Sequence, residues 1–429
     1  MSYVRQGELF SYEEFVDAHD DNTRLVLTLS ALRDEGLVSW LRAQRKRRRD
    51  DYPLEMLWRC VVAKYVYQIT TYAELIRELW RNGSLRRLVG IKHSGRIPHD
   101  YHFSRLLKLL SLPEGLAQLA GMFEELVGRL SEALPELGRH LAVDATAVHA
   151  YSNEMRKDKS DPDAAWSARP KRQRRRKRSG GVAEYLDYWF GYQVHLVVDC
   201  QTELPVGFEV TAANENETTR FEPLLEALQR SQPQLVARTE AVMADAGYDS
   251  QANCRFVLEQ LEALPIIKMR LTQKKGELCQ AAEELCTELG TQVCLSGHEM
   301  VYAGRDGGWL KWRCPVACGK AEKCQMLGPC TASKYGAVRK VSIQADPRRY
   351  PGLWRDSKKW KRLYRKRTAA ERVNARLKDF LLLDELTVRG MQKVQAHVGM
   401  GLVVMLAGAW AMVSADKVDQ ARRIVRLAA

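Results

Sequence analysis

The sequence has neither of the apolar segments that mark exported or membrane-spanning chains. Residues 1–12 are polar and hold no apolar stretch of the kind that a secretory signal needs. The longest apolar run, residues 398–413, has 16 residues, three of them glycine. That is shorter than the roughly 20 residues that cross a bilayer. The run therefore predicts a buried C-terminal helix, and we expect a cytoplasmic protein.

Cysteine is too sparse, and too unevenly placed, to indicate a disulfide framework. The chain has ten cysteines in 429 residues, and four of them lie between Cys314 and Cys330. A chain of this size without an export signal is expected in a reducing compartment, where disulfides are rare. The cysteines therefore indicate either reduced thiols or a metal site.

Acidic residues are in deficit. There are 53 Asp and Glu against 67 Lys and Arg, which gives a net charge of +14. A strongly basic balance favours a polyanionic partner, most often nucleic acid. A generally basic protein, or one that binds a ribosome or a membrane surface, has the same charge. From the charge we expect a nucleic acid as the partner.

Hydrophobic spacing divides the chain into a helical part and an α/β part. Residues 23–135 carry apolar side chains at helical spacing, and Thr71 with Glu74 forms a capping box before one predicted helix. We expect residues 1–135 to form a helical N-terminal domain. Beyond residue 138 strands and helices alternate, which predicts the α/β class with a mixed sheet.

Two carboxylates end apolar segments that are predicted to be strands. Asp144 closes the first segment, residues 140–144, and Asp245 closes the second, residues 240–245. Strand ends are where α/β sheets usually hold functional groups, although either Asp could instead cap a turn. Residues 154–184 between them form a basic insertion that either binds the DNA backbone or lacks fixed structure.

A third carboxylate lies in a basic segment that is predicted to be one helix, residues 361–382. Tyr364, Arg367, Glu371 and Lys378 are spaced 3, 4 and 7 apart, so they fall within about 60° on one helix face. One acid among bases on a shared face suits both a metal ion and a phosphate. The alternative is a solvated helix with an Arg367–Glu371 pair, which is worth a few tenths of a kcal/mol.

These motifs, in this order, resemble the DDE transposases of bacterial insertion sequences. The branch they resemble is marked by Tyr-(2)-Arg-(3)-Glu-(6)-Lys, which residues 364–378 match in spacing. Further matching segments are residues 52–54, 72–75, 85–90, 97–99, 142–146, 191–195, 204–207, 210–214 and 244–250. The resemblance covers about residues 25–410. Each motif is weak by itself, but their order and spacing agree.

The resemblance implies an RNase H-like catalytic core in which Asp144, Asp245 and Glu371 hold two Mg²⁺ or Mn²⁺ ions. Two such ions can activate a water or a 3′-hydroxyl and stabilise the leaving oxygen. Tyr364, Arg367 and Lys378 would contact the DNA strand near the cut. The protein would bind terminal inverted repeats, cleave there and join the end to target DNA, as a homodimer when bound to DNA.

The resemblance also implies how the rest of the chain is divided. Residues 136–270 would form the first part of the core, and residues 346–429 would complete it. Residues 271–345 would be a Cys-rich insertion, as in related transposases. Within the insertion, Cys314, Cys318, Cys324 and Cys330 could hold a structural Zn²⁺, with Cys294 as a substitute. Their spacing lacks paired CxxC motifs, so reduced cysteines without metal are an equal alternative.

Two other functions share much of this pattern. A nuclease of the same fold would use every one of the three carboxylates without joining DNA ends. A zinc-containing DNA-binding regulator, or an inactivated transposase, would bind DNA without cutting it. The intact set of Asp144, Asp245 and Glu371 argues against the regulator.

Overall fold

The structure is a computed structural model of the chain. It describes residues 20–45, 52–92, 96–152, 160–170, 175–176, 182–183, 186–270, 278–281, 284–324 and 330–423. Most of the basic run at residues 171–178 lies outside these ranges, so its predicted contact with the DNA backbone is not addressed by the structure.

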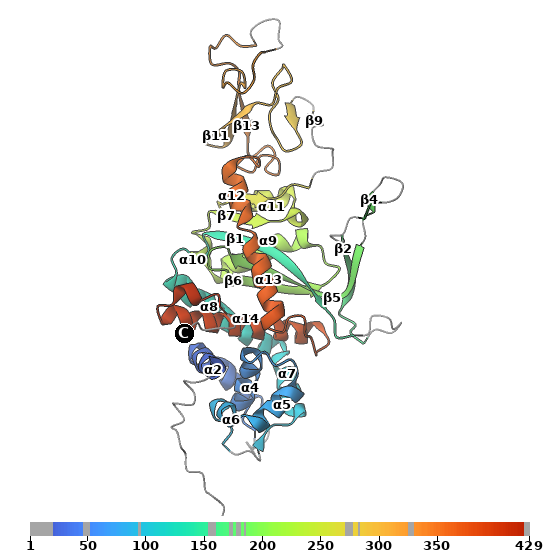
Figure 1. Cartoon of the computed structure of the whole chain (residues 1–429), viewed down its shortest axis with the longest axis vertical. Coiled ribbons are helices and arrows are strands. Elements are labelled where there is room, and N and C mark those ends of the chain that lie inside the picture. The colour runs from blue at the N-terminus through green and yellow to red at the C-terminus, as the bar shows by residue number, and fades with distance from the viewer. Residues whose placement is uncertain are drawn as a thin grey trace, which may run out of the picture.

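Helices alone make up the N-terminal part of the described chain, as the spacing predicted (Figure 1). They are α2 (Asp20–Ala31), α3 (Glu35–Ala43), α4 (Leu54–Val66), α5 (Tyr72–Arg81), α6 (Gly83–Val89), α7 (Asp100–Leu110) and α8 (Pro113–Ala133). The predicted capping box begins α5, where Thr71 and Glu74 exchange two hydrogen bonds of 3.1 Å. Gly90, at φ +90°, ends α6 in the left-handed conformation that glycine adopts without strain.

A mixed sheet forms the centre of the molecule, with the order β2-β5-β1-β7-β8 and β6 paired to β5. Its strands are β1 (His140–His149), β2 (Ala165–Pro170), β5 (Leu186–Asp199), β6 (Pro205–Ala212), β7 (Ala241–Ala244) and β8 (Leu264–Ile267). Strand β1 is antiparallel to β5 but parallel to β7, and β7 is parallel to β8. The predicted α/β class with a mixed sheet is therefore confirmed.

Helices cover both faces of this sheet. Phe208 of β6 meets the ring of Phe123 of α8 at 5.0 Å, while the next residue, Glu209, bonds Arg220 of α9 (Glu217–Ser231). Successive side chains of a strand point to opposite faces. Helix α8 therefore lies on one face and α9 on the other. The C-terminal helix α14 (Met391–Ser414) joins α8, since Gly399 also approaches Phe208.

Helix α14 confirms the predicted buried C-terminal helix but is longer than the apolar run. It has 24 residues, and by length and composition it could cross a membrane, yet 89% of its most apolar window is buried inside the protein. It packs against the sheet and the helices α4 and α8, so its apolar side chains form part of the hydrophobic core.

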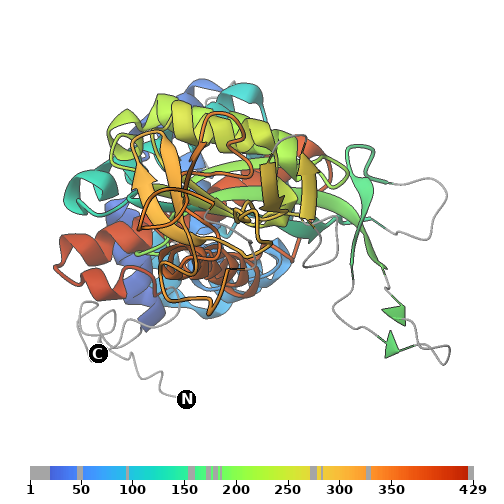
Figure 2. The same ribbon diagram turned by 90° about the horizontal axis from the view of Figure 1, so that it is seen from above.

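An arm of two strands leaves the body of the molecule where no strand was predicted. The first half of β5 pairs with β2, from Ala165↔Gly191 to Pro170↔Leu186. Figure 2 shows this arm projecting to one side, with the short strands β3 (Arg175–Arg176) and β4 (Val182–Ala183) near its tip. Part of the basic insertion at 154–184 is thus β-structured. Its polar composition gave no clear alternation of apolar and polar residues from which a strand could be predicted.

The Cys-rich segment contains strands that periodicity did not predict. These are β9 (Leu278–Ala281), β10 (Glu284–Thr287), β11 (Val301–Asp306), β12 (Trp309–Arg313) and β13 (Val338–Ser342). A separate small core lies beneath them, built around the fully buried Trp312 and bordered by Trp354 with a centroid distance of 5.3 Å. Strands of four to six residues carry a weak sequence signal.

Two predicted boundaries were wrong. Strand β1 does not end at Asp144 but continues to His149, because β5 pairs with it along its whole second half. The single predicted helix at 361–382 is divided into α12 (Lys358–Arg365) and α13 (Thr368–Phe380). Between them the backbone stays helical but tightens, with Arg367 N bonded to Tyr364 O at 3.1 Å.

Candidate active site

Parallel pairing of β1 with β7 brings the first two predicted carboxylates to the same level of the sheet. The ladder runs from His140↔Ala241 to Ala142↔Met243 and then stops. Two further residues in that register place Asp144 beside Asp245. Asp144 is thus in the middle of β1 but at the end of its parallel pairing, and Asp245 follows the last residue of β7. Strands of an α/β sheet expose functional groups where such pairing ends.

Helix α13 brings the third carboxylate to the same place. Arg367 Nη2 lies 2.5 Å from Glu371 Oε1, and Arg367 Nη1 lies 3.7 Å from Asp144 Oδ1. One guanidinium therefore spans a carboxylate of α13 and a carboxylate of β1. We call Asp144, Asp245 and Glu371 together the carboxylate site. Its first and last members, Asp144 and Glu371, are more than 200 positions apart in the chain.

The Asp144 carboxyl is the most perturbed group of the carboxylate site. Its side chain is 16% exposed, and burial raises its pKa to about 7. Arg367 opposes that rise in pKa, while the charges of Asp245 and Glu371 add to it. Asn374 Nδ2 donates a 3.0 Å hydrogen bond to Asp144 Oδ2 and holds the carboxylate in place. Asn374 was not predicted, although its spacing of three from Glu371 puts it on the same helix face.

The donor set fits hard divalent cations. Mg²⁺ and Mn²⁺ prefer carboxylate oxygens, and several partly buried carboxylates repel one another unless a cation joins them. As arranged, no group of three or more Asp, Glu, His or Cys side chains in the described residues is close enough to hold a metal. Arg367 lies between Asp144 and Glu371 and supplies the positive charge there.

The basic residues of the predicted helix face divide into two groups. Arg367 lies over the ring of Tyr364, 5.8 Å from its centroid, and both are next to the carboxylates. Lys378 is two turns further along α13, where its Nζ donates to Ala147 O at 2.8 Å and pairs with Asp384 at 2.9 Å. Arg367 and Lys378 both contact β1, but only Arg367 and its neighbour Tyr364 lie at the carboxylate site.

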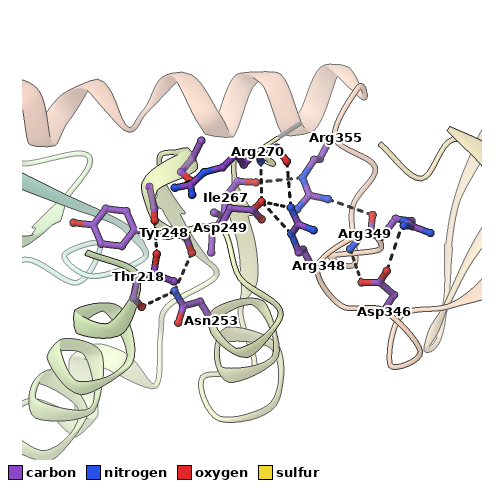
Figure 3. Close-up of polar contacts among 12 residues, drawn as sticks. Thr218, Tyr248, Asp249, Asn253, Ile267, Arg270, Asp346, Arg348, Arg349 and Arg355 are labelled. Carbon is purple, nitrogen blue, oxygen red and sulfur yellow. Dashed lines mark hydrogen bonds and ion pairs between the residues drawn. The ribbon is translucent and has the colours of Figure 1, made fainter. Parts of the chain in front are cut away.

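A network of arginines fixes the loop that follows Asp245 (Figure 3). The Asp249 side chain is fully buried and pairs with Arg348 at 2.7 Å, and it also accepts a bond from the backbone N–H of Arg270 at 2.8 Å. Arg355 reaches Ile267 O of β8 at 3.2 Å. The segment that leads into α12 is thereby tied to the ends of β7 and β8. Sequence reasoning missed Arg348 and Arg355, since no spacing connects them to Asp249.

A fourth acid, Glu217, lies beside Asp245. It is in the first turn of α9, and Thr218 Oγ1 donates to Gly247 O at 2.6 Å. Burial, together with the charge of Asp245, raises the pKa of Glu217 to about 7. The sequence offered only the start of a predicted helix here, so Glu217 was not among the predicted residues.

Nothing in the described residues supports the predicted zinc site. Cys314 and Cys318 share a turn through a 3.1 Å backbone hydrogen bond, but Cys324 and Cys330 are exposed. Cys324 Sγ instead lies 3.0 Å from Ser296 Oγ. Four thiolates that share a Zn²⁺ would have to converge within bonding distance, and the cysteines of the described chain form no such group.

Family comparison agrees with this arrangement. The family described as "Transposase DDE domain" matches residues 135–406, and the one described as "Transposase domain (DUF772)" matches residues 10–109. The chain therefore belongs to the DDE transposases of insertion sequences, the enzymes that carry out DNA transposition of these mobile elements.

Other comparisons add little. No curated protein matches the chain. Among solved structures, the cryo-EM structure of a piggyBac transposase synaptic complex with hairpin DNA matches at 11% identity and a TM-score of 0.39. That match covers 95% of this chain and 78% of the other. A likeness this weak carries no structural argument.

Proposed function

We propose that this protein binds the terminal inverted repeats of its element, cleaves the DNA there and transfers the cut end to a target. The observation that carries this proposal is the meeting of Asp144 and Glu371 on either side of Arg367, next to Asp245. Family membership supplies the reaction class, and the carboxylates supply a place for it.

The core would be RNase H-like. Three features support that assignment: β1 is antiparallel to β5 and parallel to β7, and α13 crosses the sheet over β1 and β5. Residues 136–270 and 346–429 would form this core, with residues 271–345 as the Cys-rich insertion. The Tyr364, Arg367, Glu371 and Lys378 spacing favours the branch with that signature. The helices of residues 1–135 would bind DNA, and a homodimer would hold two ends, in a cytoplasmic, nucleoid-associated complex.

Asp144, Asp245 and Glu371 would hold two Mg²⁺ or Mn²⁺ ions, which supply a lowered pKa for the attacking water or hydroxyl and charge for the leaving oxygen. The remaining groups act on the DNA and on the carboxylates themselves. Asn374 keeps Asp144 oriented. Arg367, once the carboxylates have a different counter-charge, is free to donate to a phosphate oxygen of the strand being cut. Tyr364 lies beside it and can stack or hydrogen-bond.

Cleavage of a labelled duplex tests this proposal. The duplex carries the terminal repeat with its flanking DNA, and it is incubated with Mg²⁺ or with EDTA. We expect cutting at the element boundary in Mg²⁺ alone, lost in Glu371→Gln and kept in Glu385→Gln, an exposed acid in the loop after α13. Persistent metal-dependent cutting by Glu371→Gln would refute the assignment of the carboxylate site.

The same experiment separates the two alternatives. Joining of the cut 3′ end to a second duplex distinguishes a transposase from a nuclease of the same fold. Tight, salt-sensitive binding without any cutting in Mg²⁺ or Mn²⁺ would favour a DNA-binding regulator or an inactivated copy.

A further inference from the structure

Glu217 and Asp245 approach the same point of the backbone. A Cβ atom added to Gly247 would lie 2.5 Å from Glu217 Oε2 and 2.8 Å from Asp245 Oδ1. A real Cβ essentially never makes contacts this short, so a side chain at position 247 would force at least one of the two carboxylates to shift. The backbone next to each carboxylate is fixed by Asn253, whose Nδ2 donates to Thr218 O at 3.1 Å and to Tyr248 O at 2.9 Å (Figure 3).

No cation compensates this pair at close range. Asp144 and Glu371 have Arg367, and Asp249 has Arg348. Neither Glu217 nor Asp245 forms an ion pair within 4.0 Å with a basic side chain of the described chain. The charges of Arg169 and Arg270 lower the pKa of Glu217, but neither side chain forms an ion pair with it. Two carboxylates at one point without a bonded counter-charge repel each other.

Buried polar atoms without partners lie next to the pair. The Tyr248 side chain is 1% exposed, its hydroxyl has no hydrogen-bond partner among the described residues, and Glu217, Asp144 and Asp245 all act on it electrostatically. Gln193 Oε1 and Trp189 Nε1 are unpartnered as well, and each side chain is less than 10% exposed. Buried polar atoms nearly always have a partner, so these atoms point to an occupant.

A cavity provides the room for that occupant. It measures about 230 Å³, and its walls include Glu217, Gly247, Gln193 and Trp189 together with Arg169 and Arg270. A volume of that size holds several water molecules. Mg²⁺ loses its water reluctantly and usually keeps several when one or two carboxylates bind it. A hydrated cation in this cavity therefore suits the Glu217 carboxylate and the unpartnered Gln193 Oε1, which both line it.

We propose that Glu217 is a fourth carboxylate of the active site and that, with Asp245, it binds one of the divalent cations. This inference rests on the proposed function and adds a ligand to it. Asp144 and Glu371 would hold the other cation, and Asp245 would lie between the two positions. Glu217 would then be a direct ligand of a cation, in addition to the three predicted carboxylates.

Titration of the full-length protein with Mn²⁺ tests the inference without DNA and without activity. Bound Mn²⁺ is counted by electron paramagnetic resonance and its affinity is measured by calorimetry. We expect Glu217→Gln to weaken one Mn²⁺ by at least about tenfold, since even residues behind metal ligands change affinity by that factor. Gly247→Ala should weaken the same ion, because its Cβ separates the two carboxylates. Glu226→Gln, an exposed acid on the same helix, should bind Mn²⁺ as the unmodified chain does.

Unchanged Mn²⁺ number and affinity in Glu217→Gln would overturn the inference. A loss of binding that comes with a lower melting temperature in EDTA would also overturn it, because Glu217 would then only stabilise the start of α9. Asp245→Asn separates this failure from failure of the proposed function. If Asp245→Asn loses Mn²⁺ and cleavage while Glu217→Gln keeps its Mn²⁺, only the fourth ligand is refuted. If Asp245→Asn keeps both, the proposed function fails too.

Discussion

Two regions of this protein bury ionisable side chains, and they do so in opposite ways. Between α4 and α14, His397 Nε2 lies 2.9 Å from Leu382 O and Nδ1 lies 2.9 Å from Tyr65 Oη. Lys64 lies over the rings of Tyr65 and Tyr72 at 5.3 and 5.6 Å. Burial lowers the pKa of His397 to about 4 and that of Lys64 to about 8. Both His397 nitrogens are satisfied in its neutral form.

The carboxylate site gathers charges of one sign instead. Burial raises the pKa of Asp144 and of Glu217 to about 7, and neighbouring acids add to both shifts. Arg367 is the close counter-charge of Asp144, and Glu217 has no bonded one in the described chain. The comparison shows that burial of a titratable group does not by itself indicate function. Uncompensated charge of one sign, next to unpartnered polar atoms, indicates a site awaiting a ligand.

The largest expected effect is a loss of DNA cleavage when a residue of the carboxylate site is changed, which a change in the His397 region should not cause. Asp144→Asn should lower DNA cleavage on the order of 10³-fold or more, which corresponds to about 4 kcal/mol of transition-state stabilisation. Its free energy of unfolding in EDTA should be unchanged or higher, because a repelled charge is removed. Cleavage kinetics and urea denaturation measure the two quantities. A large loss of stability would mean that Asp144 is structural, like His397.

The Asp249–Arg348 pair sharpens the comparison within the core itself. The Asp249 side chain is fully buried, and the charge of Arg348 compensates its negative charge. Arg348→Ala leaves that charge without its partner, so we expect a loss of about 2 kcal/mol in the free energy of unfolding. Since Asp249 holds the loop after Asp245, cleavage should also fall, and Arg348→Lys should restore part of it. Arg230→Ala, in an exposed pair with Glu226, is the matched control and should change little. Equal stability of Arg348→Ala and the unmodified chain would contradict this role.

A smaller effect is expected where the buried groups are satisfied. Tyr65→Phe removes the hydroxyl that lies 2.9 Å from His397 Nδ1 and should cost about 1 kcal/mol of unfolding free energy. Cleavage at a temperature where the variant stays folded should be unaffected, because the α4–α14 junction has no part in the chemistry. Thermal denaturation and the duplex assay measure these effects. If Tyr65→Phe lost cleavage activity but kept its stability, the region between α4 and α14 would have a functional role, contrary to the comparison.

The smallest effect is a pair of pH trends with opposite signs. The lowered pKa of His397 means that its contribution to stability is lost as pH falls from about 6.5 towards 4. The raised pKa of Asp144 means that, without metal, stability is lost as pH rises from about 4 towards 7. Urea denaturation in EDTA from pH 5 to 8 measures both trends. Asp144→Asn should flatten the second trend only, and Mg²⁺ should offset it in the unmodified chain. An identical pH profile for Asp144→Asn would contradict the burial of that charge.

The sequence by itself determined the class of the fold and predicted the three carboxylates as a site. Apolar segments before Asp144 and Asp245 predicted strands, and helical spacing placed Glu371 on a face with Arg367 and Tyr364. These properties are local, because the periodicity of a strand or a helix can be recognised within a short stretch of sequence. The buried C-terminal helix followed from hydrophobicity in the same way.

Only the tertiary structure decided which charges meet. The end of the β1–β7 ladder sets Asp144 beside Asp245, and the closeness of Glu217 depends on Gly247 lying between two carboxylates. Asn374 and Arg348 also reach their partners across long separations in sequence. The strands of the Cys-rich segment and of the β2–β5 arm were likewise missed. Contacts of this kind depend on register and packing between distant segments, and no local pattern encodes them.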